Sequence, residues 1–123
     1  MVRVLAVDDD PTILRLLQVN LEMDGHEVHT VDNGRDALQR IGEIEPEVLL
    51  LDVMMPHLDG WQVCEQLRSD PTFDHLPIVF LSARAQEADL ARGREVGADD
   101  YITKPFDPLE LVALVERLAR DGR

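Results

Sequence analysis

The chain has 123 residues, of which 45% are hydrophobic and 30% are charged, which is typical of one folded domain over residues 1–123. Its formal net charge of −13 opposes non-specific binding to nucleic acid or to an anionic membrane, because both require a basic protein surface. The sequence has no apolar run of membrane length and no signal peptide, so we expect a cytoplasmic protein that binds neither membrane nor nucleic acid directly.

In chain order, short apolar runs alternate with segments whose apolar residues recur at helical spacing. The apolar runs cover residues 2–7, 27–31, 48–51 and 78–81. A fifth strand is expected just before Lys104. The helical segments include residues 13–23, 37–41, 63–67 and 109–118. Continuously apolar runs are typical of strands covered on both faces. The pattern predicts five β–α units and a five-stranded parallel sheet with helices on both faces.

Capping residues place two helix starts. Asp10 and Asp107 each precede a proline, so a capping carboxylate stands before the residue favoured at the first helical position. Glu110 stands at capping-box spacing from Asp107. We interpret Asp32–Gly34 as a helix cap and turn. Three glycines are expected where helices end or turns are needed, at Gly25, Gly60 and Gly97.

Polar side chains follow the predicted strands, at the edge of the sheet where ligands bind in open α/β folds. The first strand is followed by the carboxylates Asp8, Asp9 and Asp10, and the third strand by the carboxylate Asp52. The fourth strand is followed by the hydroxyl of Ser82, and the fifth by the amine of Lys104. Two carboxylates about 4 Å apart repel by roughly 4 kcal/mol even at an effective dielectric near 20. We therefore interpret Asp8, Asp9 and Asp52 as a cation site, and Asp10 as a helix cap. Oxygen ligands at a shallow rim suit Mg²⁺.

Four motifs on this rim occur in order: V-D-D, L-L-D-V-M-M-P-H-L-D-G, L-S-A and K-P-F. Together they resemble the receiver domain of bacterial two-component response regulators, in the CheY-like superfamily, over the whole chain. The resemblance implies a flavodoxin-like, doubly wound (βα)5 fold with strand order 2-1-3-4-5. It also implies a signalling phosphoacceptor, with intrinsic Mg²⁺-dependent autophosphorylation and autodephosphorylation, rather than a conventional enzyme. The implied phosphoryl donor is the phosphohistidine of a sensor histidine kinase or of a phosphotransfer protein.

The resemblance implies which residues accept the phosphoryl group and hold the metal. Asp52 is the implied nucleophile and phosphorylation site. Asp8, Asp9 and Asp52, with the backbone carbonyl of Met54, are the implied ligands of Mg²⁺ or of Mn²⁺ in its place.

The remaining rim residues are implied to contact the phosphate or to report its presence. Lys104 is implied to pair with Asp52 and then with the phosphate, and the Lys104–Pro105 bond to be cis. Ser82 is implied to donate a hydrogen bond to the phosphate, and Tyr101 to turn inward in response. Backbone N–H groups of Met54 and Ala83 are implied phosphate donors.

Two side chains are implied to control the lifetime of the phosphorylated state. Met54 and Arg84 stand two residues beyond the acceptor and two beyond the hydroxyl. Met54 is bulky and apolar, and Arg84 can lean over the phosphate as a charged lid. We therefore expect slow self-dephosphorylation.

The segment G-A-D-D-Y-I-T-K-P-F-D-P-L-E-L resembles receivers of the OmpR/PhoB type. That resemblance implies a homodimer through the fourth helix, fifth strand and fifth helix, held by a ladder of salt bridges. The chain departs from this pattern at Leu114, where the subclass carries an arginine. Asp99 and Asp100 we interpret as solvated loop carboxylates or partner contacts. A stand-alone receiver and a piece of a longer regulator remain open.

Three other functions are compatible with an acidic residue at the end of a parallel strand. A flavin-binding flavodoxin needs a phosphate-cradling loop after the first strand, where this chain has three carboxylates. A haloacid-dehalogenase-type phosphatase needs an aspartate at the position of Met54. A pseudo-receiver that is never phosphorylated remains the alternative. We expect Cys64 to be a buried core thiol, and the histidines to be surface or turn residues, at His26, His29, His57 and His75.

Overall fold

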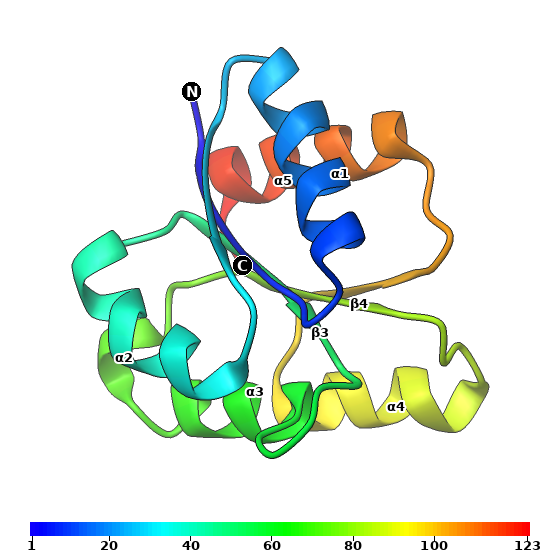
Figure 1. Cartoon of the computed structure of the whole chain (residues 1–123). Coiled ribbons are helices and arrows are strands. Elements are labelled where there is room, and N and C mark those ends of the chain that lie inside the picture. The colour runs from blue at the N-terminus through cyan, green and yellow to red at the C-terminus, as the bar shows by residue number, and fades with distance from the viewer.

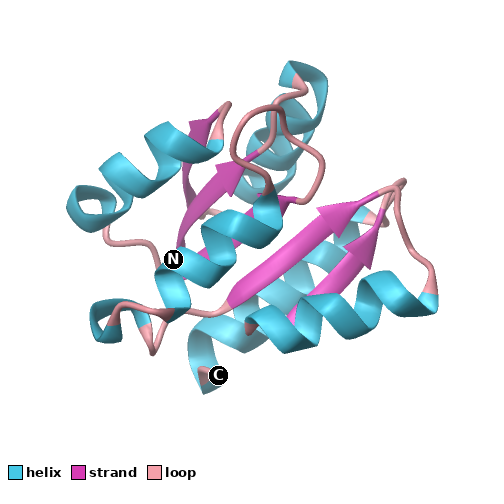
Figure 2. Ribbon diagram, turned by 90° about the horizontal axis from the view of Figure 1, so that it is seen from below, coloured by secondary structure: helices cyan, strands magenta, loops and turns pink.

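The computed structural model describes residues 1–123, and its five strands form one parallel sheet in the order β2-β1-β3-β4-β5, as predicted. The strands are β1 (Arg3–Val7), β2 (Glu27–Val31), β3 (Val48–Asp52), β4 (Ile78–Ser82) and β5 (Asp100–Thr103). The helices are α1 (Pro11–Met23), α2 (Gly34–Ile44), α3 (Gly60–Arg68), α4 (Glu87–Val96) and α5 (Pro108–Asp121), with a 3-10 turn at Pro71–Phe73. Figure 2 shows the strand arrows running in one direction.

The sheet lies between two helical layers. In Figure 1, α1 and α5 lie above the sheet, and α2, α3 and α4 lie below it. Strand β3 is buried along its whole length. Leu49 and Leu51 join the core on the α2 and α3 side, whereas Val48 and Leu50 join the core on the α1 and α5 side. Because successive side chains of a strand point to opposite faces, a strand covered on both faces must be apolar throughout.

The predicted helix caps at Asp10 and Asp107 are confirmed. The Asp10 carboxylate accepts the Thr12 N–H at 2.9 Å, and the Asp107 carboxylate accepts the Leu109 N–H at 3.0 Å. The capping box expected at Glu110 does not form: the Asp107 carboxylate accepts the Leu109 N–H instead of the Glu110 N–H, and the Glu110 side chain makes no hydrogen bond back to Asp107. The predicted cap after β2 is also confirmed, with the Asn33 side chain bound to the Asp36 N–H at 2.8 Å.

Helix α4 is the element that apolar spacing does not identify. Its only buried residues are Asp89 and Gly93, so it has no apolar stripe to give a helical period. Instead, its backbone approaches the sheet closely at Gly93, where an added Cβ would lie 3.2 Å from the Tyr101 ring and 3.4 Å from the Phe80 ring. A small residue, rather than a large apolar one, therefore brings this helix onto the sheet.

The surface placement expected for the histidines is wrong for His26. Its side chain is buried, Nδ1 accepts the Val2 N–H at 3.0 Å, and Nε2 lies 2.9 Å from Glu116. Since Nδ1 is an acceptor, Nε2 carries the proton toward Glu116. A polar residue with both ring atoms satisfied can be buried at low cost, and sequence spacing does not report such partners.

The solvated role expected for Asp99 is also wrong. Its carboxylate accepts the Ile78 N–H at 2.8 Å and pairs with Arg68 at 3.1 Å and with Arg123 at 2.9 Å. Asp100 remains accessible, and its carboxylate lies 3.8 Å from Arg117. Asp99 therefore joins the end of α3, the start of β4 and the chain end.

The prediction for Cys64 is confirmed: the thiol is buried, and burial raises its pKa to about 11. None of the helices combines the length and the apolar character needed to cross a membrane.

Candidate functional site

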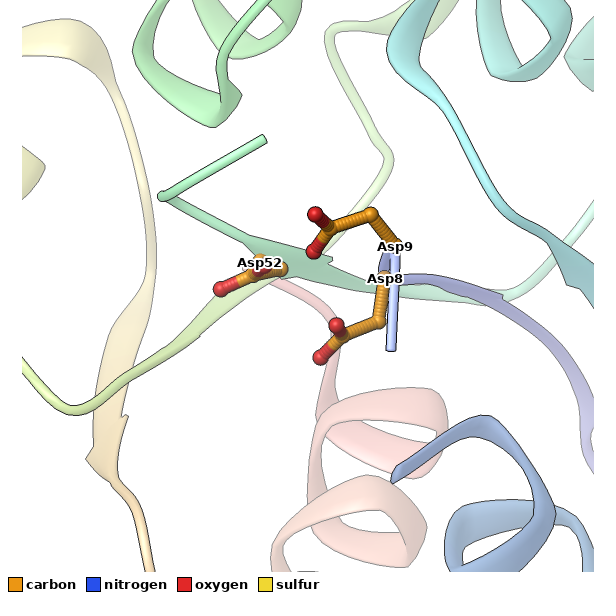
Figure 3. Close-up of side chains that lie close together, drawn as sticks. All are labelled: Asp8, Asp9 and Asp52. Atoms are coloured by element: carbon orange, nitrogen blue, oxygen red, sulfur yellow. The ribbon is translucent and has the colours of Figure 1, made fainter. Parts of the chain in front are cut away.

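Sheet topology places the acidic residues side by side. Strands β1 and β3 are neighbours, with Val7 in register with Leu51, so that Asp8 and Asp52 stand together at the carboxyl edge. Figure 3 shows the side chains of Asp8, Asp9 and Asp52 gathered at the ends of these two strands. One carboxylate oxygen from each lies within 4.8 Å of the others. The structure thus brings together the three carboxylates that the sequence proposes for a cation site.

A single lysine faces this acidic cluster. Lys104 Nζ lies 2.7 Å from the Asp8 carboxylate and 3.3 Å from the Asp52 carboxylate. Asp8 and Asp52 are buried, whereas Asp9 is exposed and forms no ion pair. Three carboxylates against one ammonium leave a formal charge of −2 at the site (−3 + 1). Buried charge of one sign favours either protonation or the binding of a cation.

The two buried carboxylates differ in how their oxygens are used. Both oxygens of Asp8 are engaged, one by Lys104 at 2.7 Å and one by the Asp10 N–H at 2.9 Å. In Asp52 only Oδ1 is engaged, by Lys104 and, weakly, by the Met54 N–H at 3.4 Å. Asp52 Oδ2 has no protein partner and is not sealed from solvent. Asp52 therefore carries the one oxygen of this pair that is open to a reactant.

The site perturbs the pKa of both Asp52 and Lys104. Burial raises the pKa of Asp52 to about 6, repulsion from Asp8 acts in the same direction, and Lys104 opposes the rise. For Lys104, burial alone would lower the pKa, but hydrogen bonding to Asp8 and attraction by both carboxylates outweigh it and raise the pKa. Lys104 is therefore fully charged at neutral pH, and Asp52 is mostly ionised.

Glycine is required where α3 meets the end of β3. A Cβ at Gly60 would collide with the carbonyl oxygen of Asp52 and would lie 2.8 Å from Val53 Cα. The start of the helix is fixed by a reciprocal capping box between Asp59 and Gln62, with both bonds at 2.9 Å. These contacts fix the start of α3 against the backbone of Asp52 and Val53, and the side chain of Met54 stays exposed.

The end of β4 links the site to the face of β5. Ser82 is fully buried, and its Oγ accepts the Arg84 N–H at 3.0 Å. The Tyr101 hydroxyl donates a hydrogen bond to the Arg84 carbonyl. The Tyr101 ring packs near Phe80, with ring centroids 6.0 Å apart, and burial raises the pKa of its phenol. Ala83 is exposed beside this loop. Ser82 and Tyr101 are therefore connected through one residue of the loop.

The implied cis peptide bond is present between Lys104 and Pro105. The backbone N–H of Lys104 donates to the Ser82 carbonyl at 2.9 Å. This hydrogen bond extends the pairing of β4 with β5 as far as Lys104, whose ammonium group lies at the site.

Sequence reasoning missed Asp89. This carboxylate is only 8% exposed, pairs with Arg84 at 3.0 Å and accepts the Gln86 N–H at 3.1 Å. The signal available in the sequence is the Q-x-x-D spacing at residues 86–89, which is compatible with a helix start. That spacing does not indicate the partner Arg84, which depends on how the loop folds back.

The donor set at the cluster fits Mg²⁺. Carboxylate oxygens are the ligands that hard divalent cations prefer, and the unneutralised charge of Asp8, Asp9 and Asp52 is the charge such an ion would offset. The site contains no nitrogen or sulfur ligand that would favour a softer metal.

Comparison with known proteins identifies the family. The model of the response regulator receiver domain matches residues 4–116. Over 118 residues the chain is 45% identical to the alkaline phosphatase synthesis transcriptional regulatory protein PhoP of Bacillus subtilis (strain 168), covering 96% of this chain and 48% of that protein. The chain spans about half the length of the curated relatives it matches.

Solved structures agree with the family match. The receiver domain of the Francisella response regulator 1452 has a TM-score of 0.91 and 32% identity, with 98% of both chains covered. The chemotaxis protein CheY4 of Vibrio cholerae has a TM-score of 0.89 and 32% identity, with 95% of this chain and 98% of that chain covered. The flavodoxin-like fold implied by the motifs is confirmed. The chain belongs to the family of response regulator receiver domains of two-component signalling systems.

Proposed function

We propose that Asp52 takes up a phosphoryl group from the phosphohistidine of a sensor histidine kinase or of a phosphotransfer protein. The observation that carries the proposal is the free Oδ2 of Asp52, in a buried carboxylate that Lys104 contacts at 3.3 Å. Asp8 is less suited, because both of its oxygens are engaged. Asp9 is less suited because it is exposed and has no cation beside it.

In the transfer step, Asp52 Oδ2 forms a bond to phosphorus while the P–N bond of the donor breaks. The electron pair of the broken bond stays on the imidazole nitrogen, and the product on Asp52 is an acyl phosphate. Since the pKa of Asp52 is about 6, the carboxylate is mostly ionised at neutral pH, and no separate base is needed. The same residues support autophosphorylation from a small acyl phosphate and slow autodephosphorylation.

Asp8, Asp9 and Asp52, with the Met54 carbonyl, would hold Mg²⁺, or Mn²⁺ in its place. When bound, the ion offsets the negative charge on the phosphoryl oxygens during transfer. Lys104 supplies a second positive charge, and its contacts to Asp8 and Asp52 keep its ammonium group between the two strands.

The phosphoryl group would be reported to the surface formed by α4, β5 and α5. Ser82 Oγ and the Tyr101 hydroxyl both bind Arg84, one at its N–H and one at its carbonyl. If Ser82 turns to donate to the phosphate, with the Ala83 and Met54 N–H groups as further donors, the loop at Arg84 loses that bond. The Arg84 carbonyl, which accepts the hydrogen bond from the Tyr101 hydroxyl, then shifts, and the Tyr101 side chain can reorient.

We propose that this surface serves a partner or a second copy of the chain, as in receivers of the OmpR/PhoB type. The similarity to the transcriptional regulator PhoP at 45% identity supports this subclass. A ladder of salt bridges between two copies cannot include Leu114, because this residue is apolar and buried against the sheet. Arg117, next to Asp100 at 3.8 Å, is the arginine of α5 that such a ladder would use.

The test is the intact mass of the protein after treatment with acetyl phosphate and Mg²⁺. Wild type should gain the mass of one phosphoryl group, Asp52→Asn should gain none, and Glu22→Gln, which removes an exposed carboxylate far from the site, should match wild type. Absence of the added mass in wild type would leave the pseudo-receiver as the better description. Modification of Asp52→Asn would show that another carboxylate is the acceptor.

A further inference from the structure

Asp89 is a buried carboxylate that the proposed phosphoryl transfer does not use. It is the third residue of α4, and one of its oxygens accepts the Gln86 N–H that precedes the helix at 3.1 Å. Its other oxygen pairs with the Arg84 guanidinium at 3.0 Å. Capping needs only the first of these contacts, so the ion pair with Arg84 requires a separate explanation.

The guanidinium of Arg84 lies next to the loop that follows Asp52. Arg84 Nη1 is 3.6 Å from Met54 Sδ, and the Met54 N–H points at the Asp52 carboxylate. Arg84 and Met54 border a cavity of about 430 Å³, together with Val53, Met55, Trp61 and Arg92. The side chain of Arg84 therefore spans from α4 to the acceptor loop and has open space beside it.

We propose that Asp89 is a positioning residue that holds Arg84 on α4 until a phosphoryl group on Asp52 replaces Asp89 as the partner of the guanidinium. The proposal rests on the proposed function of Asp52. It adds a specific exchange: one arginine, bound first by a helix carboxylate and then by the phosphate.

The exchange is favourable because the ion pair is weak and the competing anion is strong. The Arg84 side chain is 51% exposed, and pairs with such an exposed partner contribute about 0–1 kcal/mol. A phosphoryl group carries more negative charge and three acceptor oxygens, to which a guanidinium binds with two parallel hydrogen bonds. The exchange concerns only the side chain of Arg84, because the contacts of Arg84 with Ser82 and Tyr101 use its main chain. The guanidinium can therefore change its partner whether or not the loop moves.

The exchange would also change α4. Asp89 keeps its bond to the Gln86 N–H but loses its counter-charge when Arg84 leaves. The helix start would then present an unpaired carboxylate at the edge of the surface formed by α4, β5 and α5.

The test measures how tightly the site binds beryllofluoride with saturating Mg²⁺, by calorimetric titration, and how fast the phosphorylated mass decays. Asp89→Asn keeps an oxygen for the helix cap but removes the charge that binds Arg84. We expect the beryllofluoride dissociation constant to fall by about threefold to fivefold, which corresponds to about 0.7–1.0 kcal/mol, and the phosphorylated form to decay more slowly. Glu87→Gln removes an exposed carboxylate from the same helix turn and should leave both values unchanged.

The role through Arg84 is isolated by a double-mutant cycle. In an Arg84→Gln background, Asp89→Asn should have no effect on either measurement, because the guanidinium to be released is absent. An unchanged dissociation constant in Asp89→Asn, or the same change in the Arg84→Gln background, would overturn the proposal. Failure of wild type to bind beryllofluoride or to gain phosphoryl mass would instead contradict the function proposed for Asp52.

Discussion

The crowding of carboxylates predicts a pH-dependent cost to the stability of the metal-free protein, and Asp52 should account for much of it. Its pKa rises from an ordinary value of 3.8 to about 6 in the folded chain. The folded state therefore binds this proton more tightly than the unfolded state does. The stabilisation is complete below about pH 3.8 and is lost as the pH rises through 6. The full difference corresponds to about 3 kcal/mol, of which about 2 kcal/mol falls between pH 4.5 and 7.5.

The variant Asp52→Asn has no group to titrate and should escape this loss. Urea denaturation with EDTA, at pH values from 4.5 to 7.5, should show the stability of Asp52→Asn rising relative to wild type by about 2 kcal/mol across the range. Glu22→Gln, at an exposed position, should follow wild type. Parallel pH profiles for wild type and Asp52→Asn would refute the reasoning, since they would mean that the buried carboxylate has an ordinary pKa.

Three other predictions concern the same edge of the sheet. Mg²⁺ should stabilise wild type by up to about 2.7 kcal/mol at a hundredfold excess over its dissociation constant. Thermal melts should show a higher melting temperature with Mg²⁺ for wild type but not for Asp9→Asn. An unchanged melting temperature in wild type would exclude the metal site. Lys104→Ala should destabilise the metal-free protein by about 3–5 kcal/mol in urea denaturation, because it leaves two buried carboxylates without a counter-charge. A loss of stability below about 1 kcal/mol would contradict the burial of the two carboxylate charges. The double change Met54→Asn with Arg84→Glu should speed the loss of phosphorylated mass at fixed Mg²⁺, because it removes the apolar and cationic shield; unchanged or slower decay would argue against shielding.

Much of the fold follows from local pattern alone. The uninterrupted apolar run at Val48–Leu51 predicts a strand covered on both faces, and the structure buries it on both. The caps at Asp10 and Asp107 are confirmed because a cap is a contact between residues two or three apart. The sequence also predicts that Asp8 and Asp52 share one rim, because the carboxyl ends of parallel strands lie at one edge of a sheet.

Other features depend on contacts that no local pattern reports. Helix α4 has no apolar stripe and is held by the close approach of Gly93 to two rings, so its period is absent from the sequence. His26 reads as a turn histidine but is satisfied by Val2 and Glu116, the latter 90 residues away.

At the site, the sequence by itself determined which chemical groups are present, and only the tertiary structure decided how they pair. Lys104 is 96 residues from Asp8, yet their side chains are 2.7 Å apart, and this contact occupies Asp8 while Asp52 Oδ2 stays free. The ion pair of Arg84 with Asp89 likewise depends on the path of the loop before α4. Composition and periodicity determine the residue types and the alternation of strands and helices, and the family resemblance implied the strand order. The choice of partner depends on distances of a few ångströms that arise only when the elements pack.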